Sequence, residues 1–471
     1  MERASLPVVV IGAGPVGLAA AAHLLERGLE PLVLERGAQV GASVAEWGHV
    51  RFFSPWQYSI DRAAGDLLRA SGWESPDPES FPTGRDLLDR YLRPLADLPA
   101  LRDRIQLNRE VTGVTRDGFD KMKSPGREQA PYLVTVRDAN GEEEAMLARA
   151  VIDASGTWTR PNPLGASGRP ALGEASLRDR IAYGIPDVLG QARDRYVGRR
   201  VLVVGSGHSA FNVLLDLVDL AAEVPGTEIT WAIRKPAHRL GNLFGGGIND
   251  ALPARGELGT RIQQLVMTGQ LNLVTSARIT RLEAAADGIV ASGPDTRIGP
   301  VDEIIGATGF RPDLDLLSEV RLALDPAVDA PAALAPLIDP NLHSCGSVPP
   351  HGAEELKHPD ADLYIVGMKS YGRAPTFLML TGYEQVRSVA AAIAGDWEAA
   401  RDVQLVLPET GVCSSSVVLG ERGVSCCGTE AVADEAGSCC GAAPASQATS
   451  CCGDSVPQVI QLTTIGKGSC C

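Results

Sequence analysis

Short apolar runs separated by glycine, proline or charged residues repeat along most of the chain. The run Val8–Ile11 predicts a buried strand, residues 16–27 are rich in alanine and leucine and predict a helix, and Pro31–Leu34 predicts a second strand. Residues 201–204 and 229–233 repeat this pattern around another apolar stretch of helical length. A strand–helix–strand order that occurs twice predicts an α/β fold with parallel sheets.

Glycines occupy the turn between the first predicted strand and helix. Gly12, Gly14 and Gly17 form G-x-G-x-x-G, in which they serve the tight turn, close approach of a diphosphate, and helix–strand packing. Pro15 suits the first helical turn, where its missing N–H would have no partner. Glu35 ends the next strand, where an acid accepts hydrogen bonds from a ribose 2′-hydroxyl. The segment predicts a dinucleotide site on the helix N-terminus for an adenosine without a 2′-phosphate.

A second glycine turn begins at residue 205, with alanine at its third position. The residues of this turn that we expect to bind a nucleotide are Gly205, Gly207, His208, Ser209 and Ala210. Arg234 and Lys235 follow the next strand, where the first motif has an acid, and cations there suit the 2′-phosphate of NADPH. The other interpretation of this pair is an ordinary solvated loop. Two dinucleotide sites in one chain indicate hydride transfer from a nicotinamide to a flavin, FAD.

The remaining predicted strands set the domain organisation. Three short runs typical of a β-meander insert are residues 111–114, 132–136 and 150–152. Residues 304–305 and 363–368 predict strands that return to the first domain, and a helix of about residues 375–394 follows. We therefore predict two Rossmann-like dinucleotide-binding domains, with the FAD domain interrupted by the NADPH domain. The predicted parts are residues 1–165 (FAD-binding domain, first part), 196–300 (NADPH-binding domain), 301–398 (FAD-binding domain, return segment) and 399–471 (a flexible, cysteine-rich tail).

Charge and hydropathy narrow the range of partners. The formal net charge is −15 and the pI is near 5.0, which argues against nucleic acid or an anionic membrane as a partner. The apolar stretch of residues 8–25 resembles a signal peptide or short membrane span, but the glycine turn interrupts and explains it. We expect a soluble, cytoplasmic protein that acts on a small-molecule or metalloid substrate; the sequence does not predict an oligomeric state.

All ten cysteines lie at or beyond Cys345, and eight of them form adjacent pairs. The paired residues, our candidate metal ligands, are Cys426, Cys427, Cys439, Cys440, Cys451, Cys452, Cys470 and Cys471. Adjacent cysteines are poor disulfide partners for each other but suit soft ions such as trivalent arsenic, mercury, copper(I) or zinc. A redox dithiol relay and a low-complexity tail without function are the alternatives. Because no cysteine precedes Cys345, a catalytic disulfide beside the flavin is not expected.

Five motifs together resemble the flavin-dependent monooxygenase and thioredoxin-reductase-like superfamily. They are GAGPVG, DASGTWTRPNPLG, GSGHSAFN, GATGFRPD and LYIVGMKSYGRAPTF, within residues 7–400. The nearest likeness is to the flavin monooxygenases of bacterial arsenic-resistance operons. This resemblance implies FAD on the first glycine turn, NADPH on the second, and oxygen transfer to a soft nucleophile.

One stretch departs from the pattern of the related class B monooxygenases. These enzymes carry F-x-G-x-x-x-H between their two nucleotide motifs, whereas this chain has Ala154 and Arg160 in place of the phenylalanine and the histidine. The usual role of that histidine at the nicotinamide therefore does not carry over. Contact with a cofactor phosphate and anchoring of a linker are both open for Arg160.

Further candidates surround the predicted flavin. Gly309 and Gly367 lie where the backbone is expected to approach the cofactor, and Arg51, with Ser54 and Trp56, is expected to line it or to pack nearby. The candidates for catalysis, near the flavin or the substrate, are Cys345, Lys369, Tyr371 and Arg373. His351, Glu354, Glu355, Lys357 and His358 crowd one loop, for which a solvated charged surface is favoured over metal ligation.

Three functions follow from these patterns. The first is an NADPH- and FAD-dependent monooxygenase acting on a soft nucleophile such as a trivalent arsenical. The second is an FAD-dependent dithiol or metal reductase that uses the C-terminal pair Cys470–Cys471. The third is a thiol-rich metal- or metalloid-binding protein whose flavoprotein body senses redox state.

Overall fold

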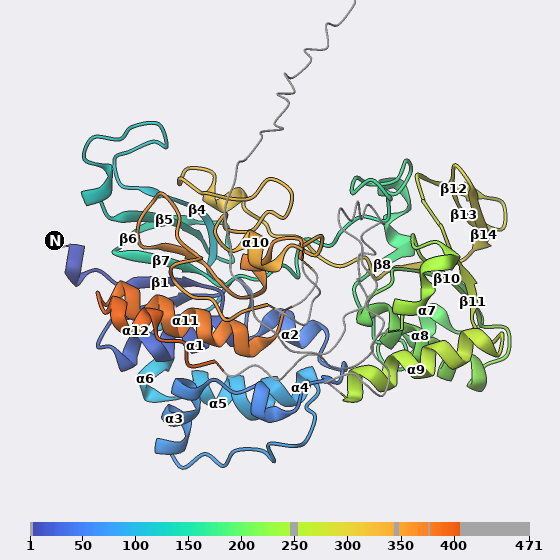
Figure 1. Cartoon of the computed structure of the whole chain (residues 1–471), viewed down its shortest axis with the longest axis horizontal. Helices are drawn as coiled ribbons and strands as arrows, with labels where there is room; N and C mark the ends of the chain where they lie inside the picture. The colour runs from blue at the N-terminus through green and yellow to red at the C-terminus, as the bar shows by residue number, and fades with distance from the viewer. Residues whose placement is uncertain (1–2, 245–252, 343–347, 375–376, 406–471) are drawn as a thin grey trace, which may run out of the picture. The chain divides into compact units, whose positions relative to one another are not determined.

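The computed structural model describes residues 3–244, 253–342, 348–374 and 377–405 (Figure 1). The chain divides into two units, Met1–Val418 and Leu419–Cys471, and every described residue belongs to the first. All ten cysteines, among them Cys345 and the four adjacent pairs, lie outside the described residues. No helix in the described ranges combines the length and the apolar character needed to cross a membrane.

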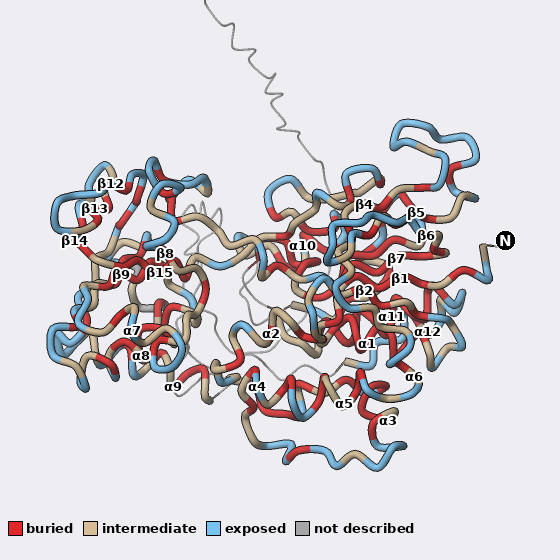
Figure 2. Tube along the Cα trace, turned by 180° about the vertical axis from the view of Figure 1, so that it is seen from behind, coloured by how far each residue is buried: buried red, intermediate tan, exposed pale blue. Residues whose placement is uncertain are grey.

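A five-stranded parallel sheet forms the centre of the first domain. Its strand order is β16-β7-β1-β2-β3, and β1 pairs with β2 through Val10 and Val33. The strands are β1 (Val8–Ile11), β2 (Pro31–Leu34), β3 (Ile105–Gln106), β7 (Ala150–Asp153) and β16 (Leu363–Ile365). Figure 2 shows these strands largely in the red of buried residues, which agrees with their apolar sequences.

Helices cover one face of this sheet and a β-meander covers the other. Helices α1 (Pro15–Glu26) and α11 (Met379–Ile393) bury alanine and valine side chains in one core cluster. The meander consists of β4 (Glu110–Arg116), β5 (Tyr132–Arg137) and β6 (Glu143–Ala148), and packs on the opposite face. The assignment of residues 150–152 to the meander is wrong, because they form β7 of the parallel sheet. Smaller helices complete the domain: α2 (Ala42–Glu46), α3 (Arg62–Ala70), α4 (Gly84–Leu87), α5 (Arg93–Ala96), α6 (Pro99–Arg102), α10 (Ala335–Ile338) and α12 (Trp397–Arg401).

The second domain repeats the plan with another five-stranded parallel sheet of order β11-β10-β9-β15-β8. Its strands are β8 (Ile181–Tyr183), β9 (Arg200–Val204), β10 (Glu228–Ala232), β11 (Asn272–Val274) and β15 (Glu303–Gly306), and its helices are α7 (Arg193–Tyr196), α8 (His208–Glu223) and α9 (Pro253–Met267). A second meander, which the sequence did not predict, contains β12 (Arg281–Ala285), β13 (Gly288–Gly293) and β14 (Thr296–Val301). Helices and meander again pack on opposite faces.

Two extended segments connect the domains and pair with each other. Pro161 and Phe310 form a β-bridge, the Asn162 amide donates to Gly309 O at 2.8 Å, and the Arg311 amide donates to Arg160 O at 3.0 Å. The chain leaves the first sheet after β7, builds the second domain, and returns to add β16. This order confirms the predicted fold class, two Rossmann-like domains with the first interrupted by the second.

The structure continues beyond residue 399, where the sequence placed the start of the tail. Helix α12 crosses that position, and the Arg387 guanidinium donates to Ala399 O at 2.8 Å. The Gln404 amide donates to Glu384 Oε1 at 3.2 Å. Residues 399–405 therefore pack on α11, which composition alone did not reveal.

Candidate active site

The first glycine turn joins β1 to α1. Gly12 has a φ of 99°, and a Cβ atom on Gly17 would lie 1.9 Å from the Gly12 carbonyl oxygen, so neither position suits a larger residue. A Cβ atom on Gly14, by contrast, would meet no described atom outside its own turn within 4 Å. Gly14 is the N-cap of α1 and Pro15 begins the helix, so no side chain of the N-cap covers the first amides. The turn has the open face and helix N-terminus that a diphosphate requires.

The carboxylate of Glu35 lies over this turn. Its Oε2 accepts a hydrogen bond from the Ala13 amide at 2.8 Å, and its Oε1 accepts one from the Gly37 amide at 2.7 Å. Two backbone amides thus fix the side chain at the end of β2. Each carboxylate oxygen keeps a second acceptor position, which fits the predicted contact with a ribose hydroxyl.

A buried ion pair lies at the carboxyl end of β7, beside the same turn. Lys369 Nζ is 2.6 Å from Asp153 Oδ2 and 3.0 Å from Ser155 Oγ, and both charged side chains are fully buried. A Cβ atom on Gly12 would lie 3.0 Å from Ala154 O, so the pair adjoins the glycine turn. The Lys369 ammonium is balanced inside the protein. Any effect of Lys369 on a bound flavin must therefore act through its ion pair with Asp153.

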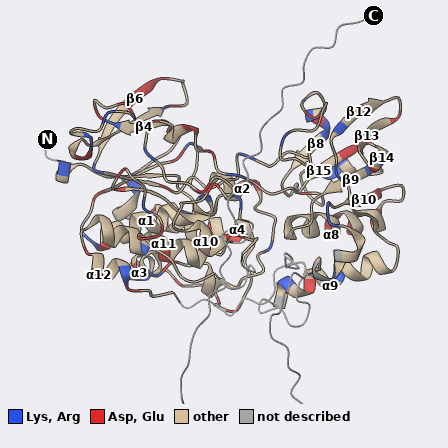
Figure 3. Ribbon diagram, turned by 45° about the horizontal axis from the view of Figure 1, so that its top comes forward, with Lys and Arg blue, Asp and Glu red and all other residues tan. Residues whose placement is uncertain are grey.

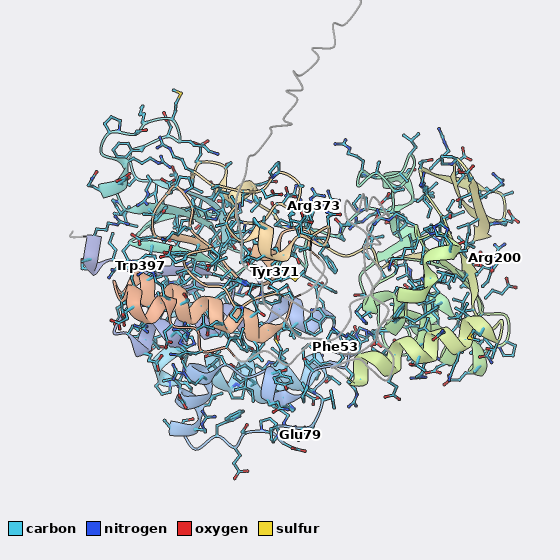
Figure 4. All side chains as sticks on the ribbon, viewed as in Figure 1. Phe53, Glu79, Arg200, Tyr371, Arg373 and Trp397 are labelled. Carbon is cyan, nitrogen blue, oxygen red and sulfur yellow. The ribbon has the colours of Figure 1, made fainter. Side chains whose placement is uncertain are left out.

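Tyr371 and Arg373 follow Lys369 but face different partners (Figure 4). The Tyr371 ring is 2% exposed and packs edge-on against Phe377, with 5.2 Å between the ring centroids. Burial raises the pKa of the Tyr371 phenol, so this group stays protonated near neutral pH. The Arg373 guanidinium pairs with Asp329 instead. The three candidates therefore do not converge on one point.

The return segment packs directly onto the start of α1. Gly367 has a φ of 67°, and a Cβ atom there would lie 3.3 Å from the Val16 side chain. The Gly367 amide donates to Gln385 Oε1 at 2.7 Å. A Cβ atom on Gly382 of α11 would lie 2.8 Å from Val16. These contacts hold the segment after β16 and the start of α11 against the start of α1; the approach of Gly367 to the cofactor stays a prediction.

The two histidines of the 351–358 loop are buried, so the expectation of a solvated loop is wrong for them. His351 is 3% exposed and His358 is 8% exposed. His351 Nδ1 lies 3.0 Å from Pro349 O, which can only accept, so Nε2 is the acceptor for Gln385 Nε2 at 2.9 Å. Burial lowers the pKa of His351, and it lowers the pKa of His358 to about 4. Among the described residues no group of three His, Asp or Glu side chains is placed to hold a metal.

The second glycine turn repeats the design of the first between β9 and α8. Gly205 has a φ of 142°, and a Cβ atom there would lie 2.1 Å from Ala307 O. A Cβ atom on Gly207, the N-cap of α8, would meet no described atom beyond the turn within 4 Å. Ala210 is fully buried in the third position. His208 begins α8, and its ring centroid is 5.7 Å from that of Phe211. Ser209 follows in the first turn of the helix.

Arg234 and Lys235 lie just beyond the end of β10, as predicted. Arg234 is exposed, and its Nη1 donates to Ala166 O at 3.3 Å. The remaining nitrogens of this guanidinium leave donors for a phosphate. Lys235 is partly exposed, and its carbonyl accepts from the Ser276 amide at 3.0 Å. The binding of a 2′-phosphate by this pair stays a prediction.

The other candidates divide between the site and the scaffold. Arg51 is exposed and donates to Phe81 O at 3.3 Å, while Trp56 is 1% exposed and belongs to the core. Gly309 has a φ of 82° and belongs to the paired linkers. Arg160 Nη1 lies 2.5 Å from Asp313 Oδ1 and 3.4 Å from Asp315 Oδ2, which favours the linker role for that residue. Ser54 is 9% exposed.

Sequence reasoning missed Asp153 and Ser155. Ser155 Oγ is 2.6 Å from Asp153 Oδ1, and both contribute to the environment of Lys369. The available signal was Asp153 itself, an acid directly after the apolar run of residues 150–152. A charge at the end of a buried strand needs a partner, so its position indicates an ion pair. Its partner lies 216 residues away, which local sequence cannot identify.

Two Rossmann-like domains, each with an open glycine turn at a helix N-terminus, define a flavoprotein that binds two dinucleotides. Residues 9–333 match the pyridine nucleotide-disulphide oxidoreductase family, and the chain belongs to this family. It is therefore a flavoprotein oxidoreductase that uses FAD and a pyridine nucleotide.

Individual relatives are distant. Flavin-containing monooxygenase 1 of Oryctolagus cuniculus is 23% identical over 408 residues, 74% of this chain and 70% of that protein. Flavin-containing monooxygenase FMO GS-OX-like 2 of Arabidopsis thaliana is 25% identical over 241 residues, 46% of this chain and 48% of that protein. The chain thus spans about half the length of the Arabidopsis relative. The solved bacillithiol disulfide reductase of Bacillus cereus has the same fold, with a TM-score of 0.60 at 19% identity, covering 83% of this chain and 99% of that chain.

Proposed function

We propose that this protein is an NADPH-dependent flavin monooxygenase that transfers one oxygen atom to a soft nucleophile. The observation that carries the proposal is the presence of two open glycine turns with opposite charges beside them. Glu35 follows the strand of the first turn, which suits FAD, and Arg234 with Lys235 follows the strand of the second, which suits NADPH. The likeness to flavin-containing monooxygenases supports the same assignment.

Each part of the protein has a distinct task in this reaction. A bound FAD would supply the redox chemistry of hydride acceptance and dioxygen activation. The amides at the start of α1 and α8 would hold the two diphosphates, and Glu35 would accept a hydrogen bond from the ribose. The Asp153–Lys369 pair holds two charges rigidly beside the first turn. Tyr371 lies buried in the return segment, and its raised pKa keeps the phenol neutral.

The positions of the cysteines distinguish this proposal from a disulfide reductase. A disulfide reductase that works through a C-x-x-C or C-x-x-x-x-C pair stacked on the flavin would need two cysteines there, but no cysteine precedes Cys345 in the chain. The terminal pair Cys470–Cys471 favours the reductase, because it could serve as an external dithiol that receives electrons from FAD. Because no cysteine precedes Cys345, the monooxygenase is our primary proposal.

The substrate we propose is a trivalent arsenical. Paired cysteines in the segment beyond residue 411 are suited to capture a soft ion in the reducing cytoplasm, where they remain dithiols. The balanced reaction consumes NADPH, a proton and dioxygen, and yields NADP⁺, water and the oxidised arsenical. A thiol-rich binding protein without turnover is the competing function from another class.

The test is oxygen incorporation by the full-length, FAD-loaded protein. NADPH and ¹⁸O₂ are supplied with arsenite or an organic sulfide, and product oxygen is measured by mass spectrometry together with hydrogen peroxide. One labelled atom in the product, with peroxide falling as substrate is added, is the expected result. Anaerobic reduction of a disulfide or Hg(II) that depends on Cys470 and Cys471 would favour the reductase. Stoichiometric metal binding with negligible NADPH oxidation would favour the binding protein.

Deletion of residues 411–471 tests the capture role separately. We expect the truncated protein to oxidise NADPH as the full chain does but to lose affinity for arsenite. Unchanged arsenite affinity and turnover would exclude the tail from substrate capture while leaving the monooxygenase proposal standing.

A further inference from the structure

A cavity of about 290 Å³ lies beside the paired linkers, away from both glycine turns in sequence. Four arginines line it, from the two linkers and from the segment that leads into β8; they are Arg160, Arg169, Arg178 and Arg311. Figure 3 colours all Lys and Arg residues blue on the ribbon and labels β8, into which this segment leads. In a chain with a net charge of −15, such a concentration of positive charge in a hollow is unusual.

Three of these four arginines form no ion pair with any carboxylate in the part of the chain that the structure describes. Arg160 pairs with Asp313 at 2.5 Å. For Arg169, Arg178 and Arg311, no carboxylate of the described residues lies within ion-pair distance. Arg178 instead lies over the Tyr183 ring, 5.1 Å from its centroid.

The carboxylate that lines the cavity is already occupied. Glu174 accepts hydrogen bonds from the Leu164 amide at 3.0 Å, the Ala171 amide at 2.6 Å and the Tyr183 hydroxyl at 2.5 Å. These three donors stabilise its charge and fix the shape of the wall. Glu174 therefore shapes the cavity wall, and among the described residues it forms no ion pair with the four arginines.

One arginine is held rigidly in position. Arg311 Nε donates to Asn162 Oδ1 at 2.8 Å, and its Nη2 donates to Gly168 O at 3.1 Å. Burial lowers the pKa of Arg311, and the neighbouring charges of Arg373 and Arg160 act in the same direction. The Arg311 guanidinium is thus fixed near other guanidinium groups, which is the arrangement that an anion site requires before its ligand binds.

We propose that this cavity binds a tetrahedral oxyanion, a phosphate or phosphoryl group. The planar guanidinium fork matches two oxygens of such a group, and several arginines together suit a dianion better than a single carboxylate. The ligand has two chemical sources, a free oxyanion or a phosphate of the pyridine nucleotide. The second is relevant because Arg234 donates to Ala166, on the loop that also supplies Gly168 to the cavity.

The first experiment measures binding of inorganic phosphate to the full-length, FAD-loaded protein by calorimetry at low salt. The test variant is Arg169→Ala with Arg178→Ala, because both residues are exposed and neither forms an ion pair among the described residues. The matched control is Arg297→Ala, an exposed arginine of β14 in the same domain. We expect saturable binding that the double variant weakens about tenfold or more and that the control leaves unchanged. Absence of saturable binding, or equal binding by all three proteins, would overturn the proposal.

A second arm identifies the source of the oxyanion with 2′,5′-ADP as the probe. Displacement of phosphate by 2′,5′-ADP, with the same loss in the double variant, would assign the cavity to the nucleotide phosphate. Simultaneous binding of both would assign it to a free oxyanion. Neither result depends on monooxygenase activity, so a failure of the proposed reaction and a failure of this site are separable.

Discussion

The two glycine turns follow the same plan but place their closest contact differently. In the first turn the narrow point lies between Gly17 and Gly12, where a Cβ atom would meet the carbonyl oxygen at 1.9 Å. In the second, Ala210 replaces that glycine and is accommodated. The narrow point is now between Gly205 and Ala307, at 2.1 Å for a Cβ atom. Each turn needs a small residue where its backbone comes closest to another backbone segment. That position is on the helix in the first domain and at the end of the strand in the second.

The corners beside the two turns also correspond. The sequence D-A-S-G begins at Asp153 after β7, and G-A-T-G begins at Gly306 at the end of β15. The first corner carries a buried carboxylate paired with Lys369. The second carries no charge at that position, and a Cβ atom on Gly306 would lie 2.9 Å from the Tyr183 ring. Equivalent positions thus hold an ion pair in the predicted FAD domain and tight packing in the predicted NADPH domain.

The largest effect should come from breaking the ion pair of the first corner. Lys369→Met leaves Asp153 buried without a partner, which costs about 3–5 kcal/mol of unfolding free energy. Adding Asp153→Asn should restore much of this loss, because neither charge then remains. Urea unfolding of the FAD-loaded protein measures both changes. The control is Lys357→Met, whose half-exposed pair with Glu354 should contribute less than about 1 kcal/mol. Equal stability of Lys369→Met and the control would refute the importance of the pair.

Exchanging small residues between the two turns tests their different narrow points. Gly17→Ala forces a methyl group against the Gly12 carbonyl, so we expect a loss of about 2–3 kcal/mol and of bound flavin. Ala210→Gly, the matched change in the second turn, should cost about 1 kcal/mol, the ordinary price of glycine in a helix, and should retain flavin. Flavin absorbance and thermal unfolding report both. Full flavin content in Gly17→Ala would contradict the steric account.

Glu35 follows β2, whereas Arg234 and Lys235 follow β10. The preference for NADPH over NADH tests what the two cations after β10 contribute. Replacing Arg234 and Lys235 by alanine should raise the KM for NADPH about tenfold or more and change the KM for NADH little, because only NADPH has the 2′-phosphate. Steady-state oxidation of each nucleotide measures the ratio, and Arg297→Ala serves as the surface control. A parallel rise in both KM values would mean that the pair contacts a part shared by the two nucleotides.

Local sequence was sufficient for the first strand, helix and glycine turn, because their sterics involve neighbouring residues. It failed for the second meander, since runs such as Arg281–Ala285 mix polar and apolar residues and alternate weakly. It also failed for His351, whose charged neighbours suggested a solvated surface although α11 supplies Gln385 to cover it. Contacts between segments distant in sequence determine the second meander, the burial of His351 and the pairing of Asp153 with Lys369.

The smallest effect concerns Asp216 on α8, for which we identified no counterpart in the first domain. Burial raises the pKa of this carboxyl from 3.8 to about 6, and repulsion from Asp219 and Asp187 adds to the shift. An acid with a raised folded-state pKa binds a proton more readily when folded, so its charge opposes folding as pH rises from about 4 through about 6.

Asp216→Asn removes that charge and should raise the unfolding free energy by about 1–2 kcal/mol near pH 7.5. The gain should shrink near pH 5, where the native carboxyl is largely protonated. Urea unfolding at the two pH values measures it, with the exposed Glu257→Gln of α9 as the control. A gain that is the same at both pH values would mean that packing rather than charge is responsible. A gain that is larger at the higher pH would show that the second domain tolerates a half-buried carboxylate, whereas the first domain pairs its fully buried Asp153 with Lys369.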